Sequence, residues 1–200
     1  MKKFRYIAWG LVVVLLGVIG YTTLLPKPDT GTNTFVGAAD IGGPFSLVNQ
    51  DGDPVDQTIF DAKPYAIFFG FTNCPEICPT SLYEMAGWIE KMGPKANELE
   101  YAFVTVDPTR DTPDVLKEYV NAFSDKIVGL TGSEEQIADV VKNYRVYARK
   151  VPLEDDDYTM DHTASVFLMR SDGTFHGTIA YGEDAEIALK KLQKLAETAS

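Results

Sequence analysis

Two continuous apolar runs constrain the fold of this chain most strongly. Residues 64–71 (PYAIFFGF) and 101–106 (YAFVTV) are rich in aromatic and β-branched side chains and carry no charge. Strands with both faces buried have this composition, because helices cover both sides of a parallel sheet. A helical pattern follows each run, from about Pro79 to Met92 and from Thr112 to Phe123. This alternation predicts an α/β domain.

The rest of the chain extends the same pattern. Turn dipeptides at Asp51-Gly52 and Asp172-Gly173 each lie between strand-like segments and predict two hairpins. The segment KIVGLTG predicts a short strand, and helices are expected from Ser133 to about Tyr144 and from Glu183 to Ala196. A mixed central sheet flanked by helices, in this order, fits a thioredoxin-like fold over residues 41–200.

The N-terminal region predicts a membrane anchor. Residues 6–25 carry no charge and are long enough to cross the hydrocarbon core as a helix. Residues 1–5 contain three basic side chains, so we expect this tail in the cytoplasm and the domain on the other side. A cleaved signal peptide is the rival interpretation, but YTTLLPKP offers no small-x-small cleavage site. Residues 26–40, rich in Pro, Gly, Thr and Asp, are expected to form a linker.

The charge of the chain argues against nucleic acid as a partner. The net charge is −11, but three of the 18 basic residues lie in the tail. Beyond it, 15 basic side chains face 29 acidic ones, which leaves a net charge of −14. Nucleic acids select basic surfaces, so we expect no binding to them. The acidity serves solubility and is compatible with a basic protein partner.

Cys74 and Cys78 are the only cysteines, and three residues separate them. They follow a predicted buried strand and precede a helix, where ligands collect and thiolates are stabilised. A structural disulfide would close too small a loop to add much stability. Two unrelated cysteines are the other non-functional interpretation. The spacing suits either convergence on one metal ion or closure of a redox disulfide, so spacing alone does not decide.

A third ligand favours a metal. His162 comes just before the strand-like segment SVFLM, whereas His176 lies within a predicted strand and is interpreted as structural. Two thiolates and one imidazole form a soft set that suits copper, particularly Cu(I). Structural zinc would need a fourth protein ligand, which the sequence does not offer.

Four segments resemble the Sco/SenC family of membrane-anchored, thioredoxin-fold copper proteins. They are GGPFSLVNQDG, FFGFTNCPEICPTSL, TVDPTRDTP and DHTASVFLMRSDG, in the order that the family has them. The resemblance covers residues 40–195. It implies that Cys74, Cys78 and His162 bind one copper ion, as Cu(I) or Cu(II).

The resemblance also implies a role, a location and partners. Family members assist assembly of the binuclear copper centre in subunit II of cytochrome c oxidase, by delivering copper, reducing cysteines of that subunit, or both. We therefore expect a metallochaperone and not a turnover enzyme, acting as a monomer on that subunit or another copper enzyme, and receiving copper from another chaperone. The expected location is the bacterial inner membrane with the domain in the periplasm, or the mitochondrial inner membrane facing the intermembrane space in a eukaryote.

Other residues near these motifs have expected supporting roles. Asp161 is expected to orient the ligand loop. Asp107 and Arg110 are interpreted as structural support near the site. The acidic run Glu154 to Asp157 is interpreted as a solvated loop, with partner docking as the lesser alternative. Carboxylates are hard ligands, poorly matched to Cu(I).

A second function, from another class, remains open from the sequence. Cys74 and Cys78 would cycle as a thiol-disulfide oxidoreductase, a thiol peroxidase or a redox sensor, with His162 incidental. His162 therefore separates the two hypotheses.

Overall fold

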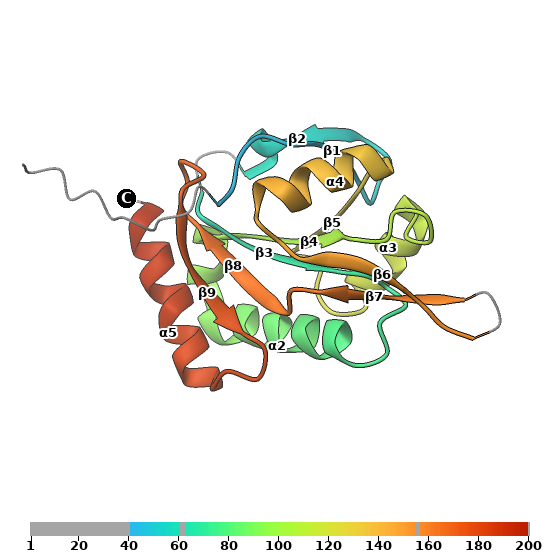
Figure 1. Ribbon diagram of the computed structural model, residues 1–200. Coiled ribbons are helices and arrows are strands. Elements are labelled where there is room, and N and C mark those ends of the chain that lie inside the picture. The colour runs from blue at the N-terminus through green and yellow to red at the C-terminus, as the bar shows by residue number, and fades with distance from the viewer. Residues whose placement is uncertain (1–40, 61–62, 155–156, 200) are drawn as a thin grey trace, which may run out of the picture. The chain divides into compact units, whose positions relative to one another are not determined.

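The computed structural model describes residues 41–60, 63–154 and 157–199 (Figure 1). Its strands are β1 (Ser46–Asn49), β2 (Pro54–Asp56), β3 (Tyr65–Gly70), β4 (Glu100–Thr105), β5 (Ile127–Thr131), β6 (Ala148–Pro152), β7 (Tyr158–His162), β8 (Ser165–Met169) and β9 (Phe175–Ala180). Its helices are α2 (Ile77–Met92), α3 (Pro113–Asn121), α4 (Glu134–Asn143) and α5 (Ala185–Ala196), with short 3-10 turns η1 (Gln57–Phe60), η2 (Gly93–Glu98) and η3 (Glu197–Ala199).

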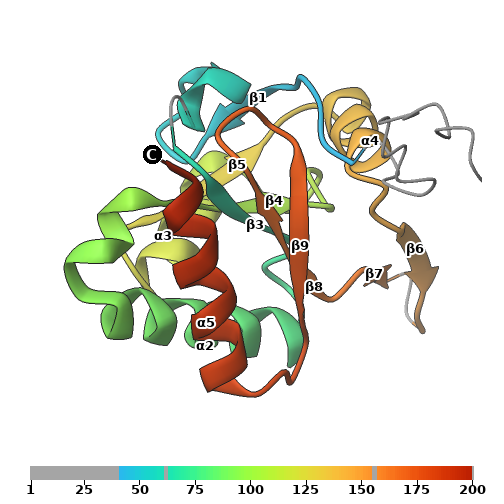
Figure 2. The ribbon, with the colours of Figure 1, turned by 90° about the vertical axis from the view of Figure 1, so that its left-hand side faces the viewer.

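Within the described residues, seven strands form a mixed sheet in the order β2-β1-β5-β4-β3-β8-β9. Strands β3, β4 and β5 are parallel, while β1, β8 and β9 run antiparallel to their neighbours. Strands β3, β4 and β5 follow one another across the sheet, so right-handed crossovers between them place α2 and α3 on the same face of the sheet. Figure 2 shows α5 beside α2 on one side of the sheet and α4 on the other. This is the predicted thioredoxin-like arrangement.

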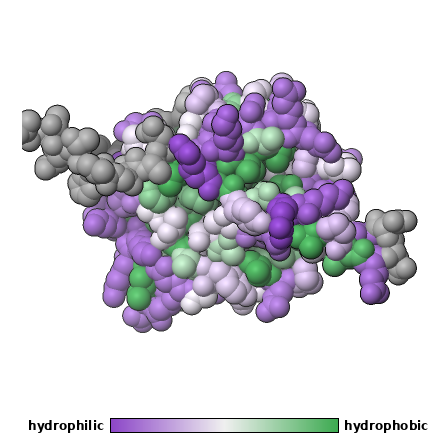
Figure 3. Space-filling view, viewed as in Figure 1, coloured by the Kyte–Doolittle hydropathy of each residue, from purple (hydrophilic) through white to green (hydrophobic). Residues whose placement is uncertain are grey.

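The two apolar runs form the centre of the core, as predicted. Every residue of β3 is buried, and in β4 only Glu100 is not. The two strands pair in parallel, with Phe68 opposite Phe103. Layers on both sides remove these side chains from water, and the hydrophobic effect stabilises the sheet by roughly 25 cal/mol for each Å² of apolar area buried. Polar side chains dominate the surface shown in Figure 3, with apolar ones in small groups between them.

Sequence signals placed the helix starts closely. The side chain of Thr112 accepts a hydrogen bond from the Val115 amide, and Ser133 forms a capping box with Gln136. Helix α2 begins at Ile77, two residues before the predicted start, so Cys78 lies in its first turn. Helix α3 ends at Asn121 and not at Phe123.

The prediction was incomplete between α4 and β8. The acidic run interpreted as a solvated loop lies in the sequence between β6 and β7, which form a two-stranded sheet of their own. His162 is therefore the last residue of a strand. No side chain of either strand is fully buried, and β6 (ARKVP) lacks the alternation of apolar and polar residues that marks a half-buried strand.

The expected membrane segment at 6–25 lies outside the described residues. Within the part of the chain that is described, no helix combines the length and the apolar character needed to cross a bilayer.

Candidate metal centre

The two cysteines lie between the end of β3 and the start of α2. Cys74 is half-buried in the connecting turn, and Cys78 is fully buried in the first helical turn. The backbone N–H of Cys78 donates to the Sγ atom of Cys74 over 3.4 Å. Amides at a helix N-terminus stabilise an anion in this way, which favours the thiolate of Cys74.

Gly70, the last residue of β3, makes room for the Cys78 thiol. A Cβ atom at this position would lie 2.7 Å from Cys78 Sγ and 2.8 Å from a ring carbon of Phe103. Neither neighbour has free space, because both side chains are fully buried. Glycine at residue 70 therefore leaves the space that the buried Cys78 sulfur occupies. No motif in the sequence marks this need for glycine.

His162 reaches the cysteines from the hairpin. Its Nε2 lies 3.3 Å from Cys78 Sγ, and its Nδ1 lies 3.1 Å from the carbonyl oxygen of Thr163. A carbonyl only accepts, so Nδ1 carries the proton of the neutral ring and Nε2 keeps its lone pair toward the sulfurs. The rings of Phe68 and Phe71 contact the imidazole edge-to-face, with centroids 6.0 and 5.8 Å away. The histidine therefore presents the nitrogen that a metal needs.

The two thiols have opposite electrostatic surroundings. Hydrogen bonding, chiefly from Cys78, lowers the pKa of Cys74 to about 3, against the opposing effect of burial. Cys78 donates to the Cys74 thiolate and is deeply buried, so its own pKa is raised. The pair thus combines a half-buried thiol of lowered pKa with a fully buried thiol of raised pKa.

The ligand atoms of Cys74, Cys78 and His162 all lie within 4.8 Å of one another. In the described part of the chain, this is the group of cysteine, histidine and carboxylate side chains close enough to hold a metal ion. Two sulfurs and one unprotonated imidazole nitrogen match the donors that Cu(I) prefers. The residues present therefore fit copper, and the sequence predicted all three of them.

A pocket of about 440 Å³ opens beside these side chains. Cys74 and His162 line it, together with Phe71, Tyr147 and Met160, whereas Cys78 lies behind the other two. Any ion held by the three ligands would have its open side toward this pocket.

Asp111 holds the loop that leads to Cys74. The backbone N–H of Thr72 donates to Oδ2 of Asp111 over 3.0 Å, and the Thr72 hydroxyl donates to Oδ1 over 2.6 Å. The Thr105 hydroxyl, at the end of β4, donates to Oδ2 over 2.6 Å. The carboxyl is buried, which raises its pKa despite these three hydrogen bonds. It thus fixes the loop after β3 to the end of β4.

Asp107 and Arg110 hold the hairpin that carries His162. The guanidinium of Arg110 pairs with Asp107 and donates to the backbone oxygen of Tyr158 over 3.0 Å. The Tyr158 hydroxyl donates to Asp107 over 2.8 Å, and its ring lies 3.8 Å below the guanidinium carbon. The predicted support role of TVDPTRDTP is confirmed: one half of the motif positions the cysteine loop and the other half the histidine hairpin.

Asp161, expected to orient the ligand loop, contacts the hairpin and not the imidazole. Its carboxylate pairs with Arg149 across the hairpin at 3.0 Å, and both side chains are more than half exposed. The carbonyl of Thr163, and not Asp161, fixes the imidazole. A backbone acceptor has no sequence signature, which is why the neighbouring carboxylate was chosen from the sequence.

The remaining candidates lie away from the ligands. His176 lies in β9, as predicted, and is not one of the residues that converge on the cysteines. In the acidic run, Asp157 lies at the tip of the hairpin and pairs with Arg110 over 3.4 Å. Residues 155 and 156 of that run are outside the described residues.

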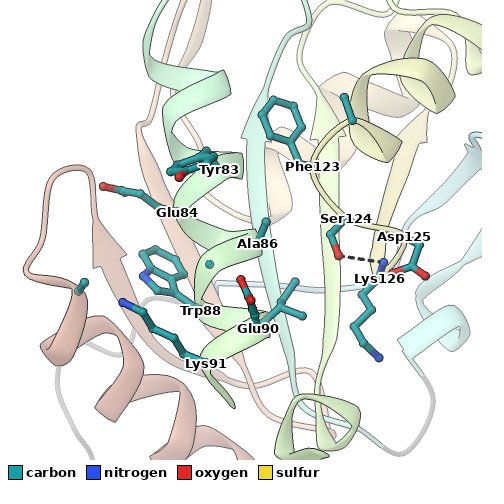
Figure 4. Close-up of a pocket in the computed structure, with 14 residues that line it drawn as sticks. Tyr83, Glu84, Ala86, Trp88, Glu90, Lys91, Phe123, Ser124, Asp125 and Lys126 are labelled. Carbon is teal, nitrogen blue, oxygen red and sulfur yellow. Dashed lines mark hydrogen bonds between the residues drawn. The ribbon is translucent and has the colours of Figure 1, made fainter. Parts of the chain in front are cut away.

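A larger pocket, of about 740 Å³, lies between α2 and the loop that follows α3. Figure 4 shows Glu90 on the side of α2 toward Phe123 and Lys126, whereas Trp88 and Lys91 extend from its other side. Its lining contains no cysteine or histidine, so this pocket is not part of the metal centre.

These features define a class: a thioredoxin-like domain in which two cysteines and a histidine form a soft ligand set at the end of the central strand. Comparison with known families then identifies the family. The profile of the SCO1/SenC family matches residues 34–197, and the chain belongs to this family.

Three relatives illustrate the similarity. The chain is 32% identical to mitochondrial protein SCO2 of Saccharomyces cerevisiae over 96% of its own length and 68% of that protein. It is 43% identical to mitochondrial SCO1 homolog 1 of Arabidopsis thaliana, over 70% of this chain but 42% of that protein. The structure of Bradyrhizobium japonicum ScoI with copper bound is 44% identical, covers 78% of this chain and 99% of that one, and superposes with a TM-score of 0.72.

Proposed function

We propose that this protein is a copper metallochaperone, not a turnover enzyme, that serves the assembly of cytochrome c oxidase. Cys74, Cys78 and His162 are the ligands of one copper ion. The observation that carries the proposal is their convergence within 4.8 Å, the two cysteines from the β3–α2 segment and the histidine from the separate β6–β7 sheet. Membership of the SCO1/SenC family and the copper-bound ScoI relative support it.

Binding would use the protonation states of the free site. The Cys74 thiolate and the Nε2 lone pair are ready to donate, while the Cys78 thiol gives up its proton when its sulfur binds. Binding therefore releases one proton per copper from Cys78. The ion is the cargo, and its open side faces the pocket through which a recipient protein would approach.

The finer parts of the proposal concern place and recipient. Residues 6–25 anchor the chain in the bacterial inner membrane, or in the mitochondrial inner membrane of a eukaryote, and 26–40 tether the monomeric domain, 41–200, on the far side. The recipient is the binuclear copper site of oxidase subunit II or another copper enzyme. The acidic domain suits a basic surface on that partner.

Replacement of one histidine tests the ligand set. In the full chain, His162→Ala should lower copper affinity strongly, because the ion loses one of its three proposed ligands, while both thiols still titrate. His176→Ala, the other histidine, is the matched control and should bind copper like the wild type. Copper stoichiometry, with optical and electron paramagnetic spectra, measures the result. Wild-type affinity in His162→Ala, or no copper in the wild type, would contradict the proposal.

The asymmetry of the two thiols favours thiol-disulfide exchange as a second candidate. The Cys74 thiolate would attack a disulfide of the partner, form a mixed disulfide and release one partner thiolate. Cys78, after losing its proton, would then attack the Cys74 sulfur, release the second partner thiolate and leave a Cys74–Cys78 disulfide. Two electrons pass to the partner. Full oxidase activity in cells that depend on His162→Ala would favour this candidate.

A further inference from the structure

Met160 lies two residues before His162 in β7, on the same face of the strand. Tyr158, two residues earlier again, contacts Arg110 through its ring, and His162 contacts Cys78. Tyr158 and His162 thus both contact residues outside the hairpin, and Met160 lies between these two side chains on the same face of β7. Its side chain is partly buried and packs against the core.

Met160 lines the same pocket as Cys74 and His162. Among the side chains that line it, Met160 brings the one sulfur that is not already in the ligand set. Glu76 and Asp161 offer only carboxylates there, and Asp161 is paired with Arg149. The open side of the metal centre thus faces a neutral, soft donor.

The alternative is that Met160 only fills space. Methionine is flexible and polarizable, and it commonly fills irregular gaps in cores. A pure filler would be replaced by leucine with little change, because the two side chains have similar volumes. Packing at residue 160 does not require a thioether, whereas ligation of Cu(I) by this residue does.

We propose that Met160 donates its thioether to copper(I) as a fourth ligand, from the pocket side of the Cys74–Cys78–His162 site. This rests on the proposed copper-binding function. A dative bond from Sδ to the ion forms, the ion remains Cu(I), and no electron or proton moves. The added soft donor selects Cu(I) over Cu(II) and gives a neutral ligand that a recipient's donor can displace.

X-ray absorption at the copper edge tests this directly. The full chain is labelled with selenomethionine and loaded with Cu(I), and copper–selenium scattering is measured. We expect this scattering in the wild type and its loss in Met160→Leu. Met169→Leu is the matched control, because Met169 pairs with Tyr65 at the opposite end of β3 from the cysteines, and it should retain the scattering.

Affinity provides the second measurement. Competition with bicinchoninate should show a Cu(I) affinity lower by on the order of 10-fold in Met160→Leu, the scale on which groups around a metal act. Cu(II) affinity, thiol titration and the Met169→Leu control should not change. Copper binding without copper–selenium scattering, whether or not the affinity falls, overturns the role of Met160 alone. A wild type that binds no copper overturns this inference and the proposed function together.

Discussion

The two halves of the metal centre are built in different ways. Cys74 and Cys78 depend on the main sheet, with Gly70 and Phe103 packed against the Cys78 sulfur and Asp111 fixing the preceding loop. His162 depends on a separate two-stranded sheet, which side chains of the β4–α3 loop hold in place. Backbone ladders and buried packing thus fix one half, and a few polar contacts fix the other. Changes to the cysteine half should therefore cost global stability, and changes to the hairpin half should mainly affect binding.

Gly70→Ala should have the largest effect. The new methyl group would meet Cys78 Sγ and Phe103 at less than 3 Å, and overpacking of this kind costs about 1–3 kcal/mol. Urea unfolding measures the loss, and copper titration should show weaker binding because Cys78 is displaced. Gly177→Ala is the control, since no atom lies within 4 Å of a Cβ there, and it should be neutral or stabilising by up to about 1 kcal/mol. Equal stability of the two variants would mean that the cysteine half is not tightly packed.

Asp111→Asn should come next, with a loss of about 1–3 kcal/mol, because an amide nitrogen would face hydrogen-bond donors in a buried place. The loss should depend on pH. Burial raises the pKa of Asp111 in the folded state above its ordinary value of 3.8. The stabilisation that the Asp111 carboxyl gives the folded state is therefore fully present below pH 3.8, and it is lost as the pH rises through the raised pKa. The deficit of the variant should therefore shrink between pH 3.5 and pH 7 in chemical denaturation, and a deficit that grows with pH would contradict the assignment.

Tyr158→Phe tests the hairpin half. It removes the hydrogen bond to Asp107 while keeping the ring below Arg110, so stability should fall by about 1 kcal/mol or less. Copper affinity should fall and amide exchange in β7 should accelerate, because His162 is carried by the loosened strand. Tyr181→Phe, at an exposed tyrosine after β9 and away from the metal centre, is the matched control. An unfolding loss as large as that of Gly70→Ala would erase the distinction between the two halves.

Asp161→Asn should have the smallest effect. The pair with Arg149 is exposed, and pairs of this kind contribute about 0–1 kcal/mol. Thermal unfolding should shift little, and copper affinity should stay at the wild-type value because the Thr163 carbonyl holds the imidazole. A marked loss of affinity would restore Asp161 to the positioning role that the sequence suggested.

Much of the fold followed from local patterns. The apolar runs of β3 and β4, the caps at Thr112 and Ser133, and the Asp-Gly turns each fix local structure through burial or hydrogen bonding. The β6–β7 hairpin was not predicted, because no side chain of its strands is fully buried and β6 lacks an apolar alternation. Long-range contacts position those strands, and a local pattern does not contain such contacts.

The sequence by itself determined the donors: two thiols at a strand end, an imidazole before a later strand, and a soft set that excludes hard-ion chemistry. The tertiary structure decided how they meet. It brought His162 to within 3.3 Å of a cysteine 84 residues earlier, selected the Nε2 lone pair through a backbone carbonyl, and lowered the pKa of one thiol while raising that of the other. The ligand distance, the tautomer and the two pKa values depend on contacts between segments far apart in the sequence and on the burial of their side chains. Only the folded chain determines these contacts.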